Sequence, residues 1–202
     1  MGNVRADENP FRASALARLR YRMSGTAADG VVTRLRAVSW RGCIRGPEGT
    51  GKTTLLEDLE ARLRDAGLAI RWARLTLESS RAERAAAMAD ATALRPGECL
   101  LFDGGEVLGW WGWHRLIHAA RRSGGGLVAT THRRCALPTV FTTRTDEALA
   151  LALARELAGA HWGPALEAAA RTAFRASGGN VREVFRAAYW HCAEKHLCGD
   201  DA

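Results

Sequence analysis

The fold of this chain is decided by the stretch Gly46-Pro47-Glu48-Gly49-Thr50-Gly51-Lys52-Thr53, which matches the pattern G-x-x-x-x-G-K-[ST]. Its glycines allow a tight turn that aims backbone N–H groups inward, where they can hold phosphate oxygens. Residues 40–45 before it can form a short strand. Residues 53–64 after it predict an amphipathic helix, because leucines recur there at i, i+3 and i+4 spacing. We therefore predict a phosphate-binding loop between a strand and a helix.

The lysine of this loop stands out against the composition of the chain. Of the 29 basic residues, 27 are arginine, and the only lysines are Lys52 and Lys195. An ammonium is a compact point charge that fits inside a phosphate-binding loop, whereas a planar guanidinium does not. We predict that Lys52 reaches the β- and γ-phosphates of a nucleotide and that the Thr53 hydroxyl binds Mg²⁺. Thr54, on the first turn of the helix, completes the predicted nucleotide-binding set.

The size of the chain and its distribution of apolar residues bound its class. At 202 residues, with 47% hydrophobic and 25% charged residues, it suits one domain with a small helical appendage. No apolar run approaches the roughly 18 residues that a membrane-spanning helix needs. Residues 1–22 carry charge throughout and lack the apolar centre of a secretory signal. We therefore expect a cytoplasmic protein with no membrane partner.

The net charge of +7 permits binding to nucleic acid. The arginines, however, are spread along the chain rather than massed in one block. A general compositional bias therefore explains the charge as well as a nucleic-acid partner does.

Further strands and helices alternate after the loop. Short apolar segments at 68–77, 98–103, 127–132 and 137–143 predict strands, and helical patterns separate most of them. Such alternation indicates a parallel sheet with crossover helices. From Asp146 onward the chain is helical, with Asp146 and Asn180 as N-caps and Pro164 as a helix start. We predict an α/β core over residues 1–145, including an N-terminal helical extension, and a lid-like helical region over 146–202.

Two of the predicted strands end in polar residues that suit phosphate chemistry. The strand over 98–103 ends at Asp103, and in a protein with this loop such a carboxylate holds Mg²⁺ through water. The strand over 127–132 ends at Thr131 and His132, where a polar group can orient an attacking water. Ligands of open α/β sheets bind at this carboxyl edge, so we expect these residues near Lys52.

These motifs resemble those of P-loop NTPases of the ASCE division. The resemblance rests on GPEGTGKT at 46–53, CLLFD at 99–103 and TTH at 130–132. It implies a three-layer fold, a five-stranded parallel sheet of order 5-1-4-3-2, and ATP with Mg²⁺ as ligands. The chain as a whole is also similar to small P-loop proteins of GC-rich bacteria.

Two branches of that division compete. The order of LLFD and VATTH is similar to that of ABC ATPases, but no LSGGQ-like signature precedes Asp103. The stretch GGNVRE at 178–183 is similar to the sensor 2 helix of AAA+ proteins, which implies that Arg182 contacts the γ-phosphate. We favour the AAA+-like interpretation. Such proteins often work as rings with an arginine finger, for which Arg121, Arg122 and Arg144 are candidates, so ATP-dependent homo-oligomers are expected.

One position departs from the AAA+ pattern. The family places a catalytic glutamate directly after the strand-end aspartate, and here that position is Gly104. Glu106 could replace it after the tight Gly-Gly turn. If it does not, hydrolysis is slow and the protein acts as a nucleotide-dependent switch.

Three functions follow from these residues. The first is an Mg-ATP-dependent ATPase in which Lys52, Asp103, Glu106, His132 and Arg182 act on the phosphates and water. The second is a small-molecule or nucleotide kinase with Arg133, Arg134 and Arg144 around an acceptor. The third is a non-hydrolysing, ATP-dependent adaptor. No guanine-reading N-K-x-D motif is present, which argues against a GTPase.

A tryptophan cluster, Trp110-Trp111-Gly112-Trp113, begins the helix that runs to Arg122. Three tryptophans at a helix start can cap the core. They can also form an exposed docking surface for a protein partner, because Trp is favoured at the energetic centres of interfaces.

Overall fold

The computed structural model describes residues 7–23 and 25–194. Contacts between Cα atoms divide the chain into two compact units. The sheet unit comprises Arg20–Gly46 and Gly51–Thr143. The helical unit comprises Pro47–Thr50 together with the described parts of Met1–Leu19 and Arg144–Ala202. Each unit has its own arrangement of elements.

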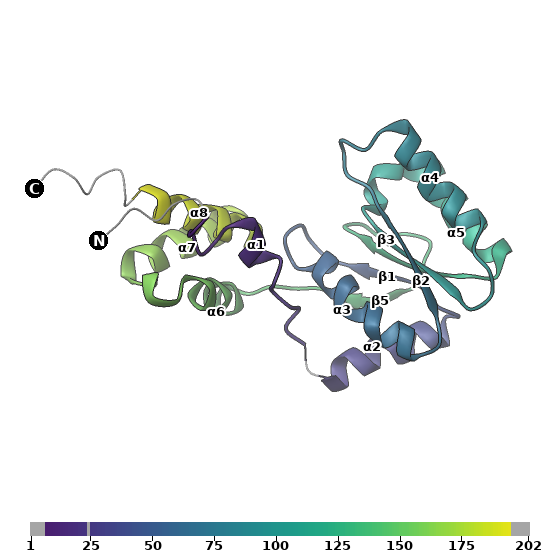
Figure 1. Cartoon of the computed structure of the whole chain (residues 1–202), viewed down its shortest axis with the longest axis horizontal. Helices are drawn as coiled ribbons and strands as arrows, with labels where there is room; N and C mark the ends of the chain where they lie inside the picture. Colours follow the sequence, from purple (N-terminus) through teal and green to yellow (C-terminus); the bar gives the residue numbers. More distant parts are fainter. Residues whose placement is uncertain (1–6, 24, 195–202) are drawn as a thin grey trace, which may run out of the picture. The chain divides into compact units, whose positions relative to one another are not determined.

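The sheet unit is built on five parallel strands (Figure 1). Their bounds are β1 Arg41–Arg45, β2 Ala69–Arg74, β3 Glu98–Asp103, β4 Gly126–Thr131 and β5 Thr139–Thr142. The strand order is β2-β3-β4-β1-β5, which is the predicted order 5-1-4-3-2 taken from the other edge. The predicted α/β fold class is therefore confirmed. Every residue of the central strand β4 is buried.

Helices cover both faces of this sheet, which makes the unit three-layered. On one face lie α2 (Gly25–Ala37) and α3 (Lys52–Asp65). On the other lie α4 (Arg81–Thr92) and α5 (Gly109–Ser123). Four leucines of α3 at helical spacing are buried against the sheet, as predicted, and they are Leu55, Leu56, Leu59 and Leu63. Ser80 begins α4 with a capping box that it shares with Glu83.

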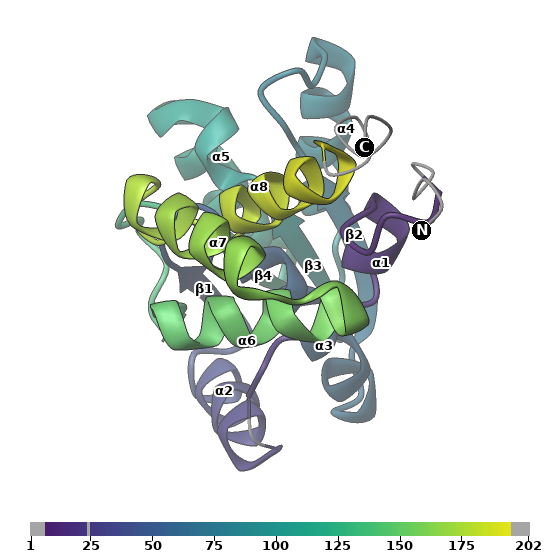
Figure 2. The same cartoon turned by 90° about the vertical axis from the view of Figure 1, so that its left-hand side faces the viewer.

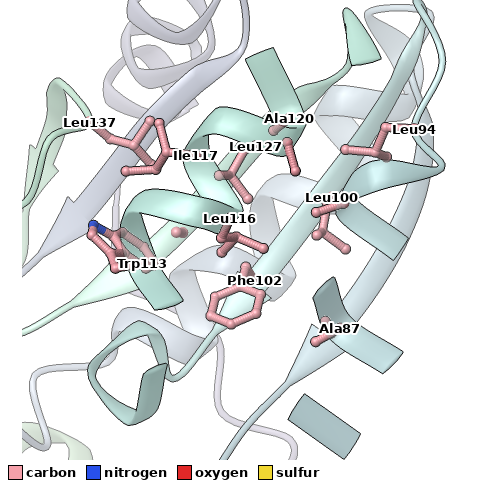
Figure 3. Close-up of a cluster of buried hydrophobic side chains, with 14 of the residues drawn as sticks. Ala87, Leu94, Leu100, Phe102, Trp113, Leu116, Ile117, Ala120, Leu127 and Leu137 are labelled. Carbon is pink, nitrogen blue, oxygen red and sulfur yellow. The ribbon is translucent and has the colours of Figure 1, made fainter. Parts of the chain in front are cut away.

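The alternation of side chains along β3 decides which face carries its terminal carboxylate. Leu100 and Phe102 belong to the cluster under α4 and α5, where Figure 3 shows them beside Leu116 of α5. Leu101 belongs to the cluster under α3. Because successive side chains of a strand point to opposite faces, Asp103 lies on the same face as Leu101. The aspartate is thereby directed toward the helix that follows the phosphate-binding loop.

The helical unit packs three main helices around a second core, and Figure 2 shows them next to one another. They are α6 Glu147–Ala158, α7 Pro164–Ala176 and α8 Val181–Glu194, and α1 Ala13–Leu16 precedes them in the chain. The predicted starts are confirmed, because the Asp146 carboxylate accepts from the Leu149 N–H and Pro164 occupies the first turn of α7. The Asn180 side chain likewise accepts from the Arg182 N–H.

The N-terminal segment contains one short helix, α1, which ends at Leu16. Beyond it, the Tyr21 N–H donates to the Asp58 carboxylate at 2.6 Å. Residues 7–19 group with the helical unit rather than with the sheet. Phe11 is the reason, because its ring is buried 6.3 Å from that of Phe185.

Two negative findings concern the described residues. Within 7–23 and 25–194, no helix is both long enough and apolar enough to cross a membrane. Over the same residues, no group of three or more His, Cys, Asp or Glu side chains could hold a metal ion.

The α3 leucines provide a test of the packing. We expect Leu56→Ala to lower the free energy of unfolding by about 2–5 kcal/mol, because Leu56 is fully buried between α3 and the sheet. Leu77→Ala is the matched control, since Leu77 is 85% exposed, and its effect should stay within about 0.5 kcal/mol. Urea unfolding followed by circular dichroism measures both. Equal effects would contradict this packing.

Candidate functional site

The phosphate-binding loop has the backbone conformation that its glycines predict. Gly49 and Gly51 have φ angles of +70° and +82°, a region that residues with a Cβ rarely adopt. Gly51 is the N-cap of α3, so the loop leads directly into the positive end of a helix dipole. The Thr50 hydroxyl donates to the Pro47 carbonyl at 2.8 Å across the turn. These features form an anion-binding turn at a helix N-terminus.

Lys52 is held inside this loop. Its side chain is buried, and its Nζ donates to the carbonyl oxygen of Gly46 at 2.9 Å. The ammonium therefore lies at the start of the loop, between β1 and α3. A buried cation is favourable only where polar or anionic groups surround it, and the Gly46 carbonyl is one such group here.

Asp103 is tied to two hydroxyl groups from different elements. The Thr53 hydroxyl of α3 donates to Asp103 Oδ2 at 2.8 Å, and the Thr130 hydroxyl of β4 donates to Oδ1. Thr130 Oγ also accepts from the Gly104 N–H at 3.2 Å. The predicted pair Thr53 and Asp103 is thus brought together, and its hard oxygen atoms are of the kind that Mg²⁺ prefers. Two observations decide the fold. The Asp103 carboxylate at the end of β3 lies beside the hydroxyl of Thr53 at the end of the loop motif, and β4 lies between β1 and β3.

The chain has the fold of the ASCE P-loop NTPases.

Thr130 is a site residue that the sequence analysis missed. The sequence pattern places the polar end of this strand at Thr131 and His132. The Thr131 hydroxyl instead bonds to the backbone of Arg133, donating to its carbonyl at 3.0 Å and accepting from its N–H at 3.3 Å. The alternation of side chains along β4 could have identified Thr130. It places Thr130 on the same face as Val128, which packs in the cluster under α3, and Asp103 lies on that face too.

The two hydroxyl bonds to Asp103 can be tested at Thr130. Thr130→Val keeps the shape of the side chain and removes the hydroxyl, which leaves Asp103 Oδ1 and the Gly104 N–H without this partner. We expect the free energy of unfolding to fall by about 1–3 kcal/mol. Thr130→Ser keeps the hydroxyl and should cost less. Chemical denaturation of the two variants measures the difference. A valine variant as stable as wild type would contradict a stabilising hydrogen bond between Thr130 and Asp103.

Gly104 cannot carry the acid that the AAA+ pattern places there. Its φ is +93°, and an added Cβ would lie 1.9 Å from the carbonyl oxygen of Leu75. The close approach arises because the Leu75 N–H donates to the Asp103 carbonyl at 2.9 Å, which extends the pairing of β2 with β3. Any side chain at position 104 would have to break this pairing. The departure from the family pattern is therefore built into the sheet.

This close approach gives a second test. Gly104→Ala should destabilise the protein by about 1–3 kcal/mol more than Gly67→Ala, because its Cβ meets backbone atoms that cannot rotate away. Gly67 is the matched control, since its φ is +90° and nothing lies within 4 Å of its added Cβ. Thermal unfolding of both variants measures the difference. Equal losses would mean that only the left-handed backbone conformation matters at position 104.

Glu106 and His132 come together at the carboxyl edge of the sheet. Glu106 lies on the short 3-10 helix η1 (Gly105–Leu108), directly after the Gly104 turn, and His132 follows β4. His132 Nε2 lies 3.1 Å from Glu106 Oε1, and both side chains are partly exposed. The two residues predicted to position water thus form one pair. A partly exposed carboxylate with an imidazole partner is suited to proton transfer.

Arg182 and the tip of the loop belong to the helical unit. Arg182 Nη1 lies 3.7 Å from Glu48 Oε1, and both side chains are largely exposed. Such surface pairs contribute little to stability. Gly49 is more constrained, because an added Cβ would lie 1.7 Å from the Asn180 side-chain oxygen. The glycine is needed here both for its φ and for the close approach of Asn180.

Two thiols lie beside the strand that precedes the loop. The Sγ atoms of Cys43 on β1 and of Cys135 lie 3.7 Å and 3.8 Å from the Leu137 carbonyl oxygen. A hydrogen bond between the two thiols lowers the pKa of Cys135 below its usual value. The same bond, with burial, raises the pKa of Cys43. Cys135 is therefore the more readily ionised thiol of the pair.

Comparisons with known proteins give distant similarities. No protein-family model matches the chain, and no curated protein matches it significantly in sequence. Among solved structures, AMPPCP-bound DnaA from Aquifex aeolicus is 14% identical with a TM-score of 0.49, over 81% of this chain and 61% of that chain. PCH-2 from C. elegans is 13% identical with a TM-score of 0.44, over 85% of this chain and 67% of that chain. Trip13 from Rhizobiales is 19% identical with a TM-score of 0.35, over 79% and 65%. These similarities are too distant to assign an activity, and the chain spans less than two thirds of the DnaA chain.

Proposed function

We propose that this protein binds Mg-ATP at the loop over 46–54 and hydrolyses it to drive a conformational switch, as AAA+ ATPases do. The observation that carries the proposal is the hydrogen bond between Thr53 and Asp103. Thr53 directly follows Lys52, whose ammonium is held by the loop. Such a cluster of ammonium, hydroxyl and carboxylate suits a nucleotide whose phosphates are bound with Mg²⁺.

The loop residues have distinct roles in this proposal. The N–H groups of the loop and the Lys52 ammonium neutralise the charge of the β- and γ-phosphates. The Thr53 hydroxyl and the Asp103 carboxylate hold Mg²⁺, which neutralises further phosphate charge. Thr130 keeps the Asp103 carboxylate oriented, because it bonds Oδ1 and leaves Oδ2 toward Thr53. Catalysis then consists mainly of positioning and electrostatic stabilisation.

Glu106 takes the place of the acid that Gly104 cannot carry. We infer that its carboxylate accepts a proton from the attacking water and that His132 orients the carboxylate through their 3.1 Å contact. Arg182 is the proposed γ-phosphate sensor, and it would exchange its contact with Glu48 for one with the nucleotide. ATP-dependent assembly of several copies, with Arg121, Arg122 or Arg144 acting in trans, belongs to the same proposal.

Two substitutions separate binding from hydrolysis. We expect Lys52→Ala to weaken binding of a fluorescent ATP analogue by more than about tenfold, because it removes the charge inside the loop. Glu106→Gln should keep that affinity and lower the release of phosphate by about 10²-fold. Glu78→Gln is the matched control, since Glu78 is an exposed glutamate of the same unit. A Lys52→Ala variant with normal binding and turnover would contradict the proposal.

The products of the reaction decide between the alternatives. Free phosphate without an added acceptor supports an ATPase, whereas ADP formation that depends on an acceptor supports a kinase. Tight binding of ATP with negligible turnover in wild type would instead support an adaptor. The exposed tryptophans Trp110 and Trp111 favour the adaptor as the second candidate, because they remain available to a partner.

A further inference from the structure

The exposed face of α5 is basic and aromatic along its length. Trp111, Arg115, His118 and Arg122 follow each other at i, i+4, i+7 and i+11, so they form one stripe on the helix. They line a groove whose other wall includes Met88 of α4 and Ala136 of the loop after β4. Eleven residues of helix make this stripe about 16 Å long. The stripe thus presents two arginine side chains and a histidine ring in a row beside an exposed tryptophan.

The arginines of α5 differ from other arginines of the sheet unit in their partners. Arg64 and Arg74 each lie 2.6 Å from a glutamate carboxylate, and Arg71 lies 3.2 Å from another. The α5 sequence contains no acidic residue. In the part of the chain that the structure describes, no carboxylate forms an ion pair with Arg115, Arg121 or Arg122.

The tryptophan cluster is divided between the core and the surface. Trp113 is buried, and Figure 3 shows its ring among the core side chains near Phe102, with a centroid distance of 6.1 Å. Trp110 and Trp111 are 63% and 75% exposed. Their ring centroids lie 4.5 Å apart, and the His114 ring lies 4.5 Å from Trp110. Two exposed indole rings in contact with each other form an apolar patch, and such patches often mark interaction sites.

We propose that this groove binds single-stranded nucleic acid. Phosphates would contact Arg115, Arg121 and Arg122, and unpaired bases would stack on Trp111, which lines the groove, and on Trp110, whose ring contacts that of Trp111. The absence of acidic residues on α5 favours a polyanion over a neutral protein surface. The exposed ring faces favour a single strand over a duplex, because the bases of a duplex already stack on each other and cannot cover an indole.

The segments that line the groove directly follow Glu106 and His132 in the chain. The helix η1, which carries Glu106, leads directly into α5, and Ala136 of the groove lies four residues after His132. A bound strand would therefore contact the segments that directly follow this pair in the chain, and it should change ATP turnover. That link rests on the proposed function, whereas binding to the groove does not.

Binding is tested without nucleotide, so that it is independent of the ATPase proposal. Fluorescence anisotropy of a labelled 15-residue oligothymidylate should show saturable binding that weakens as salt rises. We expect Trp110→Ala with Trp111→Ala to weaken binding about tenfold or more. We expect Arg115→Ala with Arg122→Ala to weaken it similarly and to lower the slope of log affinity against log salt by about 1.4. All four side chains are exposed, so these variants should fold normally.

Two matched controls isolate the groove. Arg62→Ala with Arg64→Ala removes the same charge from α3, where both arginines have carboxylate partners. Trp190→Ala removes a tryptophan that is 57% exposed on α8. Both controls should bind like wild type. No binding by wild type, or equal losses in the controls, would overturn the proposal.

Two further probes separate other anionic partners. Equal affinity for a duplex of the same length, or insensitivity to the tryptophan substitutions, would overturn stacking of a single strand. Binding to phosphatidylserine vesicles without binding to the oligonucleotide would assign the surface to lipid instead.

Discussion

The arrangement of the sheet unit depends on the carboxylate of Asp103. Its two oxygens accept hydrogen bonds from hydroxyls on α3 and on β4, so that one side chain joins three elements at the carboxyl edge of the sheet. This is feasible only because β4 lies between β1 and β3, which brings the ends of these strands and the start of α3 together. Hydrogen bonds to a charged group are stronger than those between neutral groups. The same contacts therefore fix the register of the site and contribute to stability.

The pairing of β2 with β3 has a chemical consequence at the next residue. Leu75 closes on the end of β3, and its carbonyl oxygen occupies the space that a side chain at position 104 would need. An acid can be presented only after the chain has turned, and the first one available is Glu106. Its contact with His132 places the two polar residues that follow β3 and β4 in one pair. The close approach of Leu75 thus excludes an acidic side chain at position 104, and the first acidic residue after it is Glu106.

Helix α5 shows how one segment serves two environments. Its period places Trp113, Leu116, Ile117, Ala119 and Ala120 in the core, while His114, Arg115 and His118 between them are exposed. Trp110 and Trp111 precede Trp113 by only a few residues, yet their exposure differs because 100° per residue separates their directions around the axis. A cluster that is continuous in sequence is therefore divided in space. The solvent-facing part of α5 carries arginines and tryptophans, and the α5 sequence contains no acidic residue.

The sequence by itself determined the loop and the starts of the later helices, while the strand order followed from the resemblance to P-loop NTPases. Local chemistry sets the first two features: glycines allow the turn, leucine spacing defines α3, and Asp146, Pro164 and Asn180 stand at helix starts. The pairing of Thr53 with Asp103 also followed, since parallel strands end at a common edge. The tertiary structure decided that Thr130 rather than Thr131 bonds to Asp103, because this contact depends on the register of β4 against β3 as well as on the alternation along β4. It also decided that no side chain fits at Gly104 and that Phe11 packs with the C-terminal helices, since both results come from contacts between residues far apart in the chain.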